Sequence, residues 1–387
     1  MCIGHKKGEK TGSVFVRCIN VRVKGIFLVD KYPCEWYSRL MKYRTVYKEG
    51  EILVKKLLAM ILAALMLLSL VACAPAEPSG DQPGNETGND QTGAQDKFVV
   101  GVCQLVPHDA LDAATKGFVD ALKEALGEEN VEIIEKVGGG DMATCTPIVN
   151  DFVAKEVDLI MANATPALQA AAAATEDIPI LGTSVTEYGV ALELENFNGT
   201  VGTNVSGTSD LAPLDQQAAM IKEWFPEAKN VGLLYCSAEA NSKYQVDKVK
   251  SELEGMGITA TLYAFSDTND LSMVAQSAAD ASDVIYIPTD NTVAAATGTV
   301  YDVCSAAGTL VIAGEEGICK GCGVATLSIS YYDLGVTTGK MAAKILKGEA
   351  KVSEMPIEYA PATKKYNATI CDELKLTAPE GYVAIAE

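Results

Sequence analysis

The sequence is poor in basic residues for its length. Its 387 residues include 31 Lys and Arg against 51 Asp and Glu, which gives a net charge of −20 at neutral pH. A phosphate backbone is repelled by such a chain, so we do not expect nucleic acid as a partner. The rest of the composition, 48% apolar and 21% charged, is typical of a globular protein long enough for two domains. It excludes a fibre, a disordered chain and a polytopic membrane protein.

Histidine is also scarce, and this limits the chemistry of the chain. Of the two histidines, only His108 lies after residue 73. Cys319 and Cys322 form a close pair, but no second close cysteine pair and no nearby histidine could complete a zinc site. We interpret the pair as a surface-turn disulfide or as two free thiols. Glycines 138–140 lack the rest of a nucleotide fingerprint and predict a loop. We therefore expect no metal and no cofactor.

One long apolar run, residues 57–70, follows Lys55 and Lys56 and ends at Leu-Val-Ala before Cys73. A basic flank, a short apolar stretch and small residues before the cut are typical of a secretory signal. We predict a signal peptide over residues 54–72 and a flexible tether over 73–96, which is rich in Pro, Gly, Asn and Asp. From residue 73 onward the chain holds 18 basic and 46 acidic residues, so the mature protein is strongly acidic.

Residues 1–53 precede the signal, where a leader would normally begin the chain. We predict that this extension is not made, because Lys48-Glu49-Gly50 can be encoded by an in-frame ribosome-binding sequence and Val54 by a GTG start codon.

After the tether, short apolar runs alternate with helix-like segments. Strands are predicted at 97–102, 131–134, 159–162 and 178–181, with helices at 109–126, 146–155 and 166–175 between them. A Gly, Ser and Thr-rich stretch at 200–210 precedes a second series. Its helices are predicted at 211–224, 242–256, 271–279 and 292–307, and its strands at 231–235, 258–264, 284–287 and 310–313. This alternation predicts an α/β protein with two doubly wound parallel sheets on a hinge.

Ligands of such sheets bind at the carboxyl ends of the strands. The turns there are polar and offer both helix N-termini for an anion and carboxylates for a cation, which suits an amino acid zwitterion. We predict Asp290 as the ammonium partner, with a helix cap as the alternative and Glu315 as the next candidate. Tyr188 and Tyr235 could stack on an aromatic ligand or simply pack. The predicted ligand-binding residues are Gln104, His108, Thr165, Ser184, Thr186, Ser237, Asn241, Asp290, Asn291 and Glu315.

Several motifs together resemble the substrate-binding lipoproteins of ABC transporters in the tryptophan/tyrosine-type family. They are Ala164-Thr165-Pro166-Ala167, Gly207-Thr208-Ser209-Asp210, Ser237-Ala238-Glu239-Ala240-Asn241-Ser242, Pro288-Thr289-Asp290-Asn291-Thr292 and Tyr331-Tyr332-Asp333-Leu334-Gly335. The Leu-Val-Ala-Cys73 sequence likewise resembles a bacterial lipobox, in which the cysteine is lipidated.

The resemblance implies a periplasmic-binding-protein type I fold with three hinge crossings. Lobe one would hold residues 97–206 plus 330–349, and lobe two 207–329 plus 350–387. It further implies a monomer on the outer face of the cell membrane, anchored through Cys73, that gives an amino acid, expected to be aromatic, to an ABC permease and its ATPase. No catalysis is expected. The alternatives are a surface module that senses a ligand and a surface enzyme that uses His108 and a cysteine.

Overall fold

The computed structural model of the protein describes residues 97–386. The predictions for residues 1–53, the signal peptide, Cys73 and the tether lie outside the described residues. Within the described part, no helix has the length and apolar character that crossing a membrane requires.

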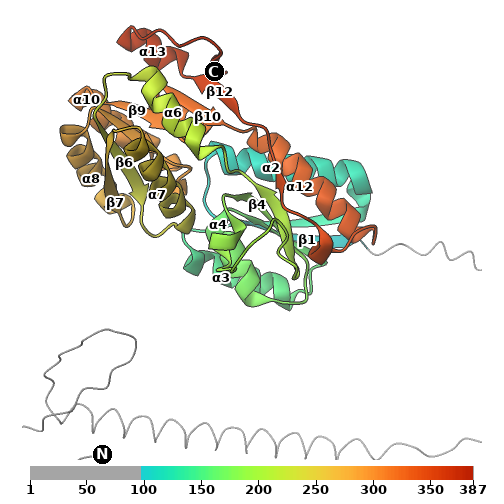
Figure 1. Cartoon of the computed structure of the whole chain (residues 1–387). Helices are drawn as coiled ribbons and strands as arrows, with labels where there is room; N and C mark the ends of the chain where they lie inside the picture. The colour runs from blue at the N-terminus through green and yellow to red at the C-terminus, as the bar shows by residue number, and fades with distance from the viewer. Residues whose placement is uncertain (1–96, 387) are drawn as a thin grey trace, which may run out of the picture. The chain divides into compact units, whose positions relative to one another are not determined.

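The first sheet contains six strands in the order β11-β5-β4-β3-β1-β2, all paired in parallel. Its strands are β1 (Phe98–Gln104), β2 (Val131–Val137), β3 (Leu159–Asn163), β4 (Ile180–Val185), β5 (Val205–Ser209) and β11 (Glu358–Tyr359). The helices of this lobe are α2 (Asp109–Leu126), α3 (Met142–Ala154), α4 (Thr165–Ala174), α5 (Tyr188–Ala191) and α12 (Tyr331–Leu346). Figure 1 shows α2 and α12 side by side, and α3 and α4 together elsewhere in the lobe.

The second sheet contains seven strands in the order β13-β12-β10-β9-β8-β6-β7. Its strands are β6 (Asn230–Cys236), β7 (Thr259–Phe265), β8 (Val284–Ile287), β9 (Leu310–Ala313), β10 (Ala325–Ser328), β12 (Thr363–Tyr366) and β13 (Val383–Ala384). Among the described pairs of this sheet, β10 and β12 are antiparallel and all others are parallel. Its helices are α6 (Leu214–Trp224), α7 (Ala240–Gly255), α8 (Thr268–Ala281), α9 (Asn291–Ala294), α10 (Thr297–Ala307), α11 (Glu316–Cys322) and α13 (Ala368–Leu374).

The chain passes between the two sheets three times, at residues 210–213, 329–330 and 360–362. The first passage leads from β5 to α6, the second from β10 to α12, and the third from β11 to β12. This connectivity confirms the predicted α/β fold of two doubly wound lobes joined by a three-crossing hinge.

The lobe boundaries differ from the prediction because β5 is a polar strand. The predicted boundary at 206/207 divides β5, and the segment 350–387 supplies β11 to the first sheet. The Ser and Thr residues of β5 give it the composition of a linker, but their hydroxyl groups form hydrogen bonds in the interior. Ser206 Oγ donates to the carbonyl of Met355 at 3.0 Å, and Thr208 Oγ1 lies 2.8 Å from Thr338 Oγ1. A strand can therefore be buried without being apolar.

Three local predictions need correction. Helix α3 begins at Met142 rather than at Thr146, because Asp141 caps it by accepting from Thr144 N at 2.8 Å, and Pro147 lies inside the helix. The single helix predicted over 292–307 is divided into α9 and α10. Cys319 and Cys322 are free thiols, which agrees with one of the two interpretations, but both are buried on helix α11 and are not part of a surface turn.

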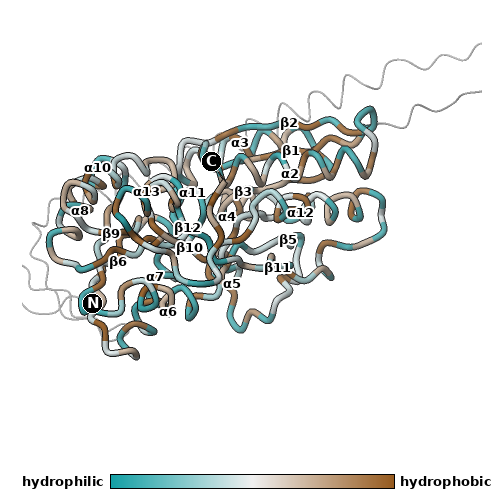
Figure 2. Tube along the Cα trace, turned by 90° about the horizontal axis from the view of Figure 1, so that it is seen from above, coloured by the Kyte–Doolittle hydropathy of each residue, from teal (hydrophilic) through white to brown (hydrophobic). Residues whose placement is uncertain are grey.

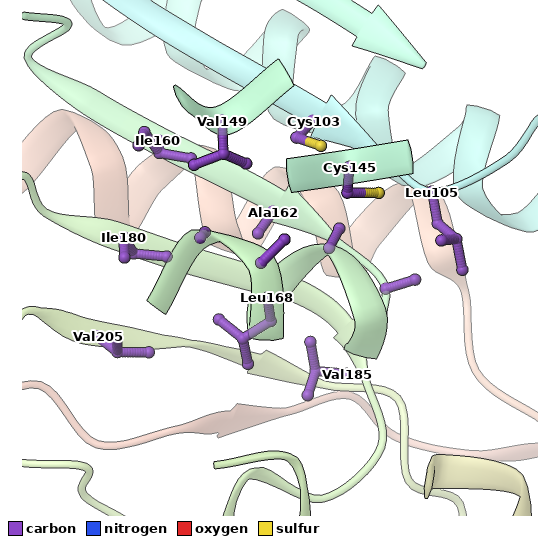
Figure 3. Packing of buried hydrophobic residues seen from close by; sticks show 14 of the residues in the cluster. Cys103, Leu105, Cys145, Val149, Ile160, Ala162, Leu168, Ile180, Val185 and Val205 are labelled. Atoms are coloured by element: carbon purple, nitrogen blue, oxygen red, sulfur yellow. The ribbon is translucent and has the colours of Figure 1, made fainter. Parts of the chain in front are cut away.

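Apolar side chains from both faces of each sheet form the cores. In Figure 2 the central strands are mostly hydrophobic, whereas the covering helices alternate between hydrophobic and hydrophilic residues. Figure 3 shows one such core between the first sheet and helices α3 and α4. Cys103 and Cys145 lie within it, and both are fully buried.

Helices α2 and α12 approach each other so closely that glycine is required at their contact. A Cβ atom at Gly335 would lie 2.0 Å from the carbonyl oxygen of Ala114, and one at Gly117 would lie 2.1 Å from that of Tyr332. Both obstacles are backbone atoms, which cannot rotate away as a side chain can. The pairing fixes α12, and with it the hinge crossing that precedes it, to the first lobe.

Candidate functional site

A small cavity brings together residues from both lobes at the carboxyl ends of the strands. Its volume is about 10 Å³. It is lined by His108, Leu111, Asp210, Thr289, Asp290, Asn291, Ala294, Glu315 and Tyr331. Four of the predicted ligand-binding residues, His108, Asp290, Asn291 and Glu315, are therefore in one place. The other six, Gln104, Thr165, Ser184, Thr186, Ser237 and Asn241, are not in its lining.

His108 connects the two lobes. It precedes α2, and its Nε2 lies 3.3 Å from Oδ1 of Asn291 at the start of α9. Burial lowers the pKa of the His108 ring, although Asn291 and the neighbouring acids act in the opposite direction. A neutral imidazole that shares a hydrogen bond with an amide is suited to holding the lobes together.

The cysteine nearest to His108 in the sequence is unsuited to nucleophilic chemistry. Cys103 is fully buried in the core shown in Figure 3. A hydrogen bond with Cys145 and burial raise the pKa of the Cys103 thiol far above its usual range. Because the thiolate is the reactive form, the alternative of an enzyme using His108 and this cysteine has no support in the geometry.

Asp290 caps a helix, as the alternative interpretation in the sequence proposed. Its Oδ1 accepts from Val293 N at 2.9 Å and its Oδ2 from Cys236 N at 2.7 Å. Burial and the nearby Glu239 raise the pKa of this carboxyl group. Both oxygens already have partners within the protein, which weakens the case for Asp290 as the ammonium partner.

Glu315 has the same kind of role at the start of α11. Its carboxylate accepts hydrogen bonds from Gly317 N and Ile318 N. Burial raises its pKa to about 7. Each oxygen therefore has a backbone partner, as in Asp290.

Glu239 is a buried carboxylate that the sequence analysis missed as a site residue. Its Oε2 accepts from Asn291 Nδ2 at 2.6 Å and from Asn291 N at 3.1 Å. Its Oε1 accepts from Thr292 N at 2.9 Å and from Thr292 Oγ1 at 2.7 Å. Glu239 thus orients the amide that faces His108. Glu239 lies within one of the motifs that carry the family resemblance, but an acid just before α7 by itself resembles an ordinary helix cap.

Asp210 was also missed, although it ends one of the motifs quoted above. It follows β5 directly, is 4% exposed, and accepts a hydrogen bond from the hydroxyl of Tyr331 at 3.0 Å. Its other oxygen, Oδ1, has no hydrogen-bond partner among residues 97–386. Burial raises the pKa of Asp210 to about 6.

Buried hydroxyls with unmet hydrogen-bonding capacity lie at the carboxyl ends of the interior strands β3 and β4 of the first sheet. Thr165 Oγ1 and Ser184 Oγ are buried and have no partner within the described part of the chain. Thr165 opens α4, whose first backbone N–H groups are available to an anion. The backbone is strained here, with φ of 90° at Ala164 and 54° at Ser184. Asn241 Oδ1, in the first turn of α7 after β6, likewise lacks a partner in the described region.

The remaining predicted residues are Thr186, Gln104 and Ser237. Thr186 is buried, and its backbone carbonyl accepts from Ser209 Oγ at 2.8 Å. Gln104 bonds to Thr115 at 2.7 Å and to Asp112 at 2.6 Å, and Ser237 donates to the carbonyl of Phe265 at 2.9 Å. Tyr188 and Tyr235 pack in the cores rather than facing the cavity. Residues 97–386 contain no group of three or more His, Cys, Asp or Glu that could hold a metal ion.

Two α/β lobes, three crossings and polar groups converging between the lobes define a type I binding protein. Residues 99–387 match the family described as ABC transporter substrate binding protein. The chain belongs to this family, and it is a substrate-binding protein and not an enzyme. This confirms the resemblance found in the sequence.

Individual relatives agree with this assignment. The chain is 34% identical over 316 residues to the tyrosine-binding protein of Clostridioides difficile strain R20291, covering 80% of this chain and 89% of that protein. The structure of an ABC domain from Streptococcus pneumoniae in complex with L-Trp is similar with a TM-score of 0.71, at 33% identity, covering 75% of this chain and 100% of that one. The ligand-free, open structure of a substrate binding protein with adhesive properties from Clostridium difficile gives a TM-score of 0.58 at 37% identity, covering 74% and 99%.

Proposed function

We propose that the protein captures an aromatic amino acid outside the cytoplasm and delivers it to the permease and ATPase of an ABC importer. The observation that carries this proposal is the similarity to two relatives, one a tyrosine-binding protein and one solved with L-Trp. The TM-score is higher for the L-Trp complex than for the open, ligand-free structure, although the open structure has the higher sequence identity. The conformation of this chain is therefore more similar to the one that holds an amino acid.

The chemistry of the cavity region supports a zwitterionic ligand. We propose that the α-carboxylate binds at the N-terminus of α4, where Thr165, Ser184 and Thr186 are buried and two of their hydroxyls lack partners in the described chain. The ammonium group would face the carboxylates that line the cavity. His108, Asn241 and Asn291 would contact the ligand from the region where the lobes meet. Gln104 and Ser237 use their side chains for hydrogen bonds inside their own lobes, so we do not propose them as ligand contacts.

A panel of ligands tests the class. Purified protein should melt at a higher temperature with L-tyrosine, L-tryptophan or L-phenylalanine than with other amino acids, sugars or nucleosides. A ligand that binds only the folded state stabilises it by about 2.7 kcal/mol at a concentration of one hundred times Kd. Mass spectrometry of material retained on the purified protein would identify the natural ligand. A clear thermal shift with a sugar or nucleoside, and none with the three aromatic amino acids, would reject the proposal.

We also propose that Cys73 is lipidated and anchors the protein to the membrane. Two acyl chains, at about 0.8 kcal/mol per buried CH2 group, are enough for stable attachment. A fatty-acid probe fed to cells should label the wild-type protein and leave Cys73→Ser unlabelled. Cys371→Ser is the matched control, because it removes a buried thiol from the folded part of the chain. Equal labelling of the wild type and Cys73→Ser would contradict the anchor.

A further inference from the structure

Asp210 begins the first crossing of the hinge, and Tyr331 directly follows the second. Asp210 is the first residue after β5, where the chain leaves the first lobe. Tyr331 is the first residue of α12, where the chain returns to it. Their side chains meet in a buried hydrogen bond of 3.0 Å between the Tyr331 hydroxyl and Asp210 Oδ2. Both residues also line the small cavity.

Asp210 differs from the other carboxylates of this region in one respect. The two oxygens of Asp290, of Glu315 and of Glu239 all accept hydrogen bonds from the protein. Oδ1 of Asp210 accepts no hydrogen bond of ordinary geometry from the described residues, although the side chain is 4% exposed, and the nearby Thr186 hydroxyl is close enough only to lower the pKa of the carboxyl group. A buried carboxylate oxygen without a donor is costly, and in a binding protein a ligand can supply that donor.

An ammonium group supplies what this oxygen lacks. It carries three N–H donors and a positive charge, and a buried ammonium must itself be paired. No described Lys or Arg forms an ion pair with Asp210. Glu315 is near enough to add negative potential around the cavity.

We propose that Asp210 Oδ1 accepts the ammonium group of the amino acid, and that Tyr331 is a positioning residue that holds the carboxylate in place across the hinge. The proposal rests on the proposed function, since it specifies how the same ligand is held. Recognition of the amine would then take place on the hinge itself, and not on a residue that only one lobe carries.

The test compares two ligands on two variants. The probes are L-tyrosine and 3-(4-hydroxyphenyl)propionic acid, which lacks only the amine. Calorimetry should show that wild-type protein prefers tyrosine, and that Asp210→Asn weakens tyrosine binding on the order of 100-fold while leaving the weak binding of the analogue nearly unchanged. Asp283→Asn is the matched control. Asp283 accepts from two backbone N–H groups at the start of β6, outside the cavity lining, so tyrosine affinity should stay at the wild-type value.

Tyr331→Phe separates positioning from packing. It removes the hydroxyl that lowers the pKa of Asp210. The carboxylate stays buried, and Thr186, Glu315 and Tyr188 remain its neighbours. The pH at which tyrosine affinity begins to fall should therefore move upward in Tyr331→Phe. Loss of packing alone would lower affinity equally at every pH.

Three outcomes would overturn the inference. Asp210→Asn could bind tyrosine as the wild type does, or it could lose both ligands equally, or Asp290→Asn could remove the preference for the amine while Asp210→Asn keeps it. Failure of the wild type to bind any amino acid would instead contradict the proposed function. Melting temperatures of the ligand-free variants confirm that each one is folded.

Discussion

Tyrosine binding is expected to weaken about tenfold when the pH is lowered from about 7 to about 5, because Asp210 must be ionised to accept an ammonium group. Burial raises the pKa of Asp210 to about 6 in the ligand-free protein. A bound cation stabilises the ionised form, so full affinity is present above this pKa and is lost as the pH falls through it. Amino acids keep their zwitterionic form in this range.

Other titrating groups at the cavity act in the same direction on binding. Glu315, whose pKa burial raises to about 7, loses its negative charge on acidification. Burial lowers the pKa of His108 where the lobes meet, so protonation favours conformations in which the ring is more exposed. Calorimetry across the pH range measures the sum of these effects, and Asp210→Asn should flatten the profile. An affinity that stays constant or rises on acidification would contradict this prediction.

Stability of the ligand-free protein should respond in the opposite direction. The folded-state pKa values of Asp210 and Glu315 lie above those of unfolded chains, so their ionised forms destabilise the fold at neutral pH. Protonation removes this cost, and the free energy of unfolding is expected to rise by about 1 kcal/mol or more toward pH 5. His108 opposes the gain, because its folded pKa is lowered. General acid denaturation would lower both the affinity and the free energy of unfolding as the pH falls. A fall in affinity together with a rise in the free energy of unfolding therefore points to the buried carboxyl groups.

The second large effect is expected from a single methyl group on α12. Gly335→Ala places a Cβ atom 2.0 Å from the backbone carbonyl of Ala114, so α2 and α12 must separate. We expect a loss of about 3 kcal/mol or more in the free energy of unfolding, at the upper end of the usual cost of overpacking. Denaturant titration of both proteins measures it.

The control for this substitution lies in the second lobe. Gly298 is within α10, and no atom lies within 4 Å of where its Cβ would be. Gly298→Ala should therefore stabilise the protein by up to about 1 kcal/mol, through helix propensity alone. If Gly335→Ala were as stable as Gly298→Ala, the close helix contact would be wrong.

Much of the fold could be predicted because its signals are local. The strands β8 and β9 have the predicted bounds, since each is a short, continuous apolar run between turn residues. Helix α2 likewise spans the predicted residues 109–126. β5 was missed because its Ser and Thr residues satisfy their hydroxyls with partners distant in the sequence, such as Met355 and Thr338.

The site was harder to predict than the fold. An acidic residue after a strand and before a helix can cap the helix or bind a ligand, and the sequence is the same in both cases. Only the positions of the backbone N–H groups show that both oxygens of Asp290 are used, whereas Oδ1 of Asp210 is not. The partner that marks Asp210, Tyr331, is 121 residues away in the chain, and no local pattern connects the two.

The small size of the cavity where the lobes meet limits the rates at which a ligand can bind and dissociate. At about 10 Å³ it has room for roughly one water molecule, and His108 and Asn291, which share a hydrogen bond, both line it. An amino acid does not fit into this cavity, so the lobes must part before one can bind. Every exchange of ligand must wait for the lobes to part, so the lifetime of a complex cannot be shorter than the time the hinge takes to open. Substitutions that loosen the His108–Asn291 contact would act first on the dissociation rate, and handover to a permease would depend on what opens the hinge.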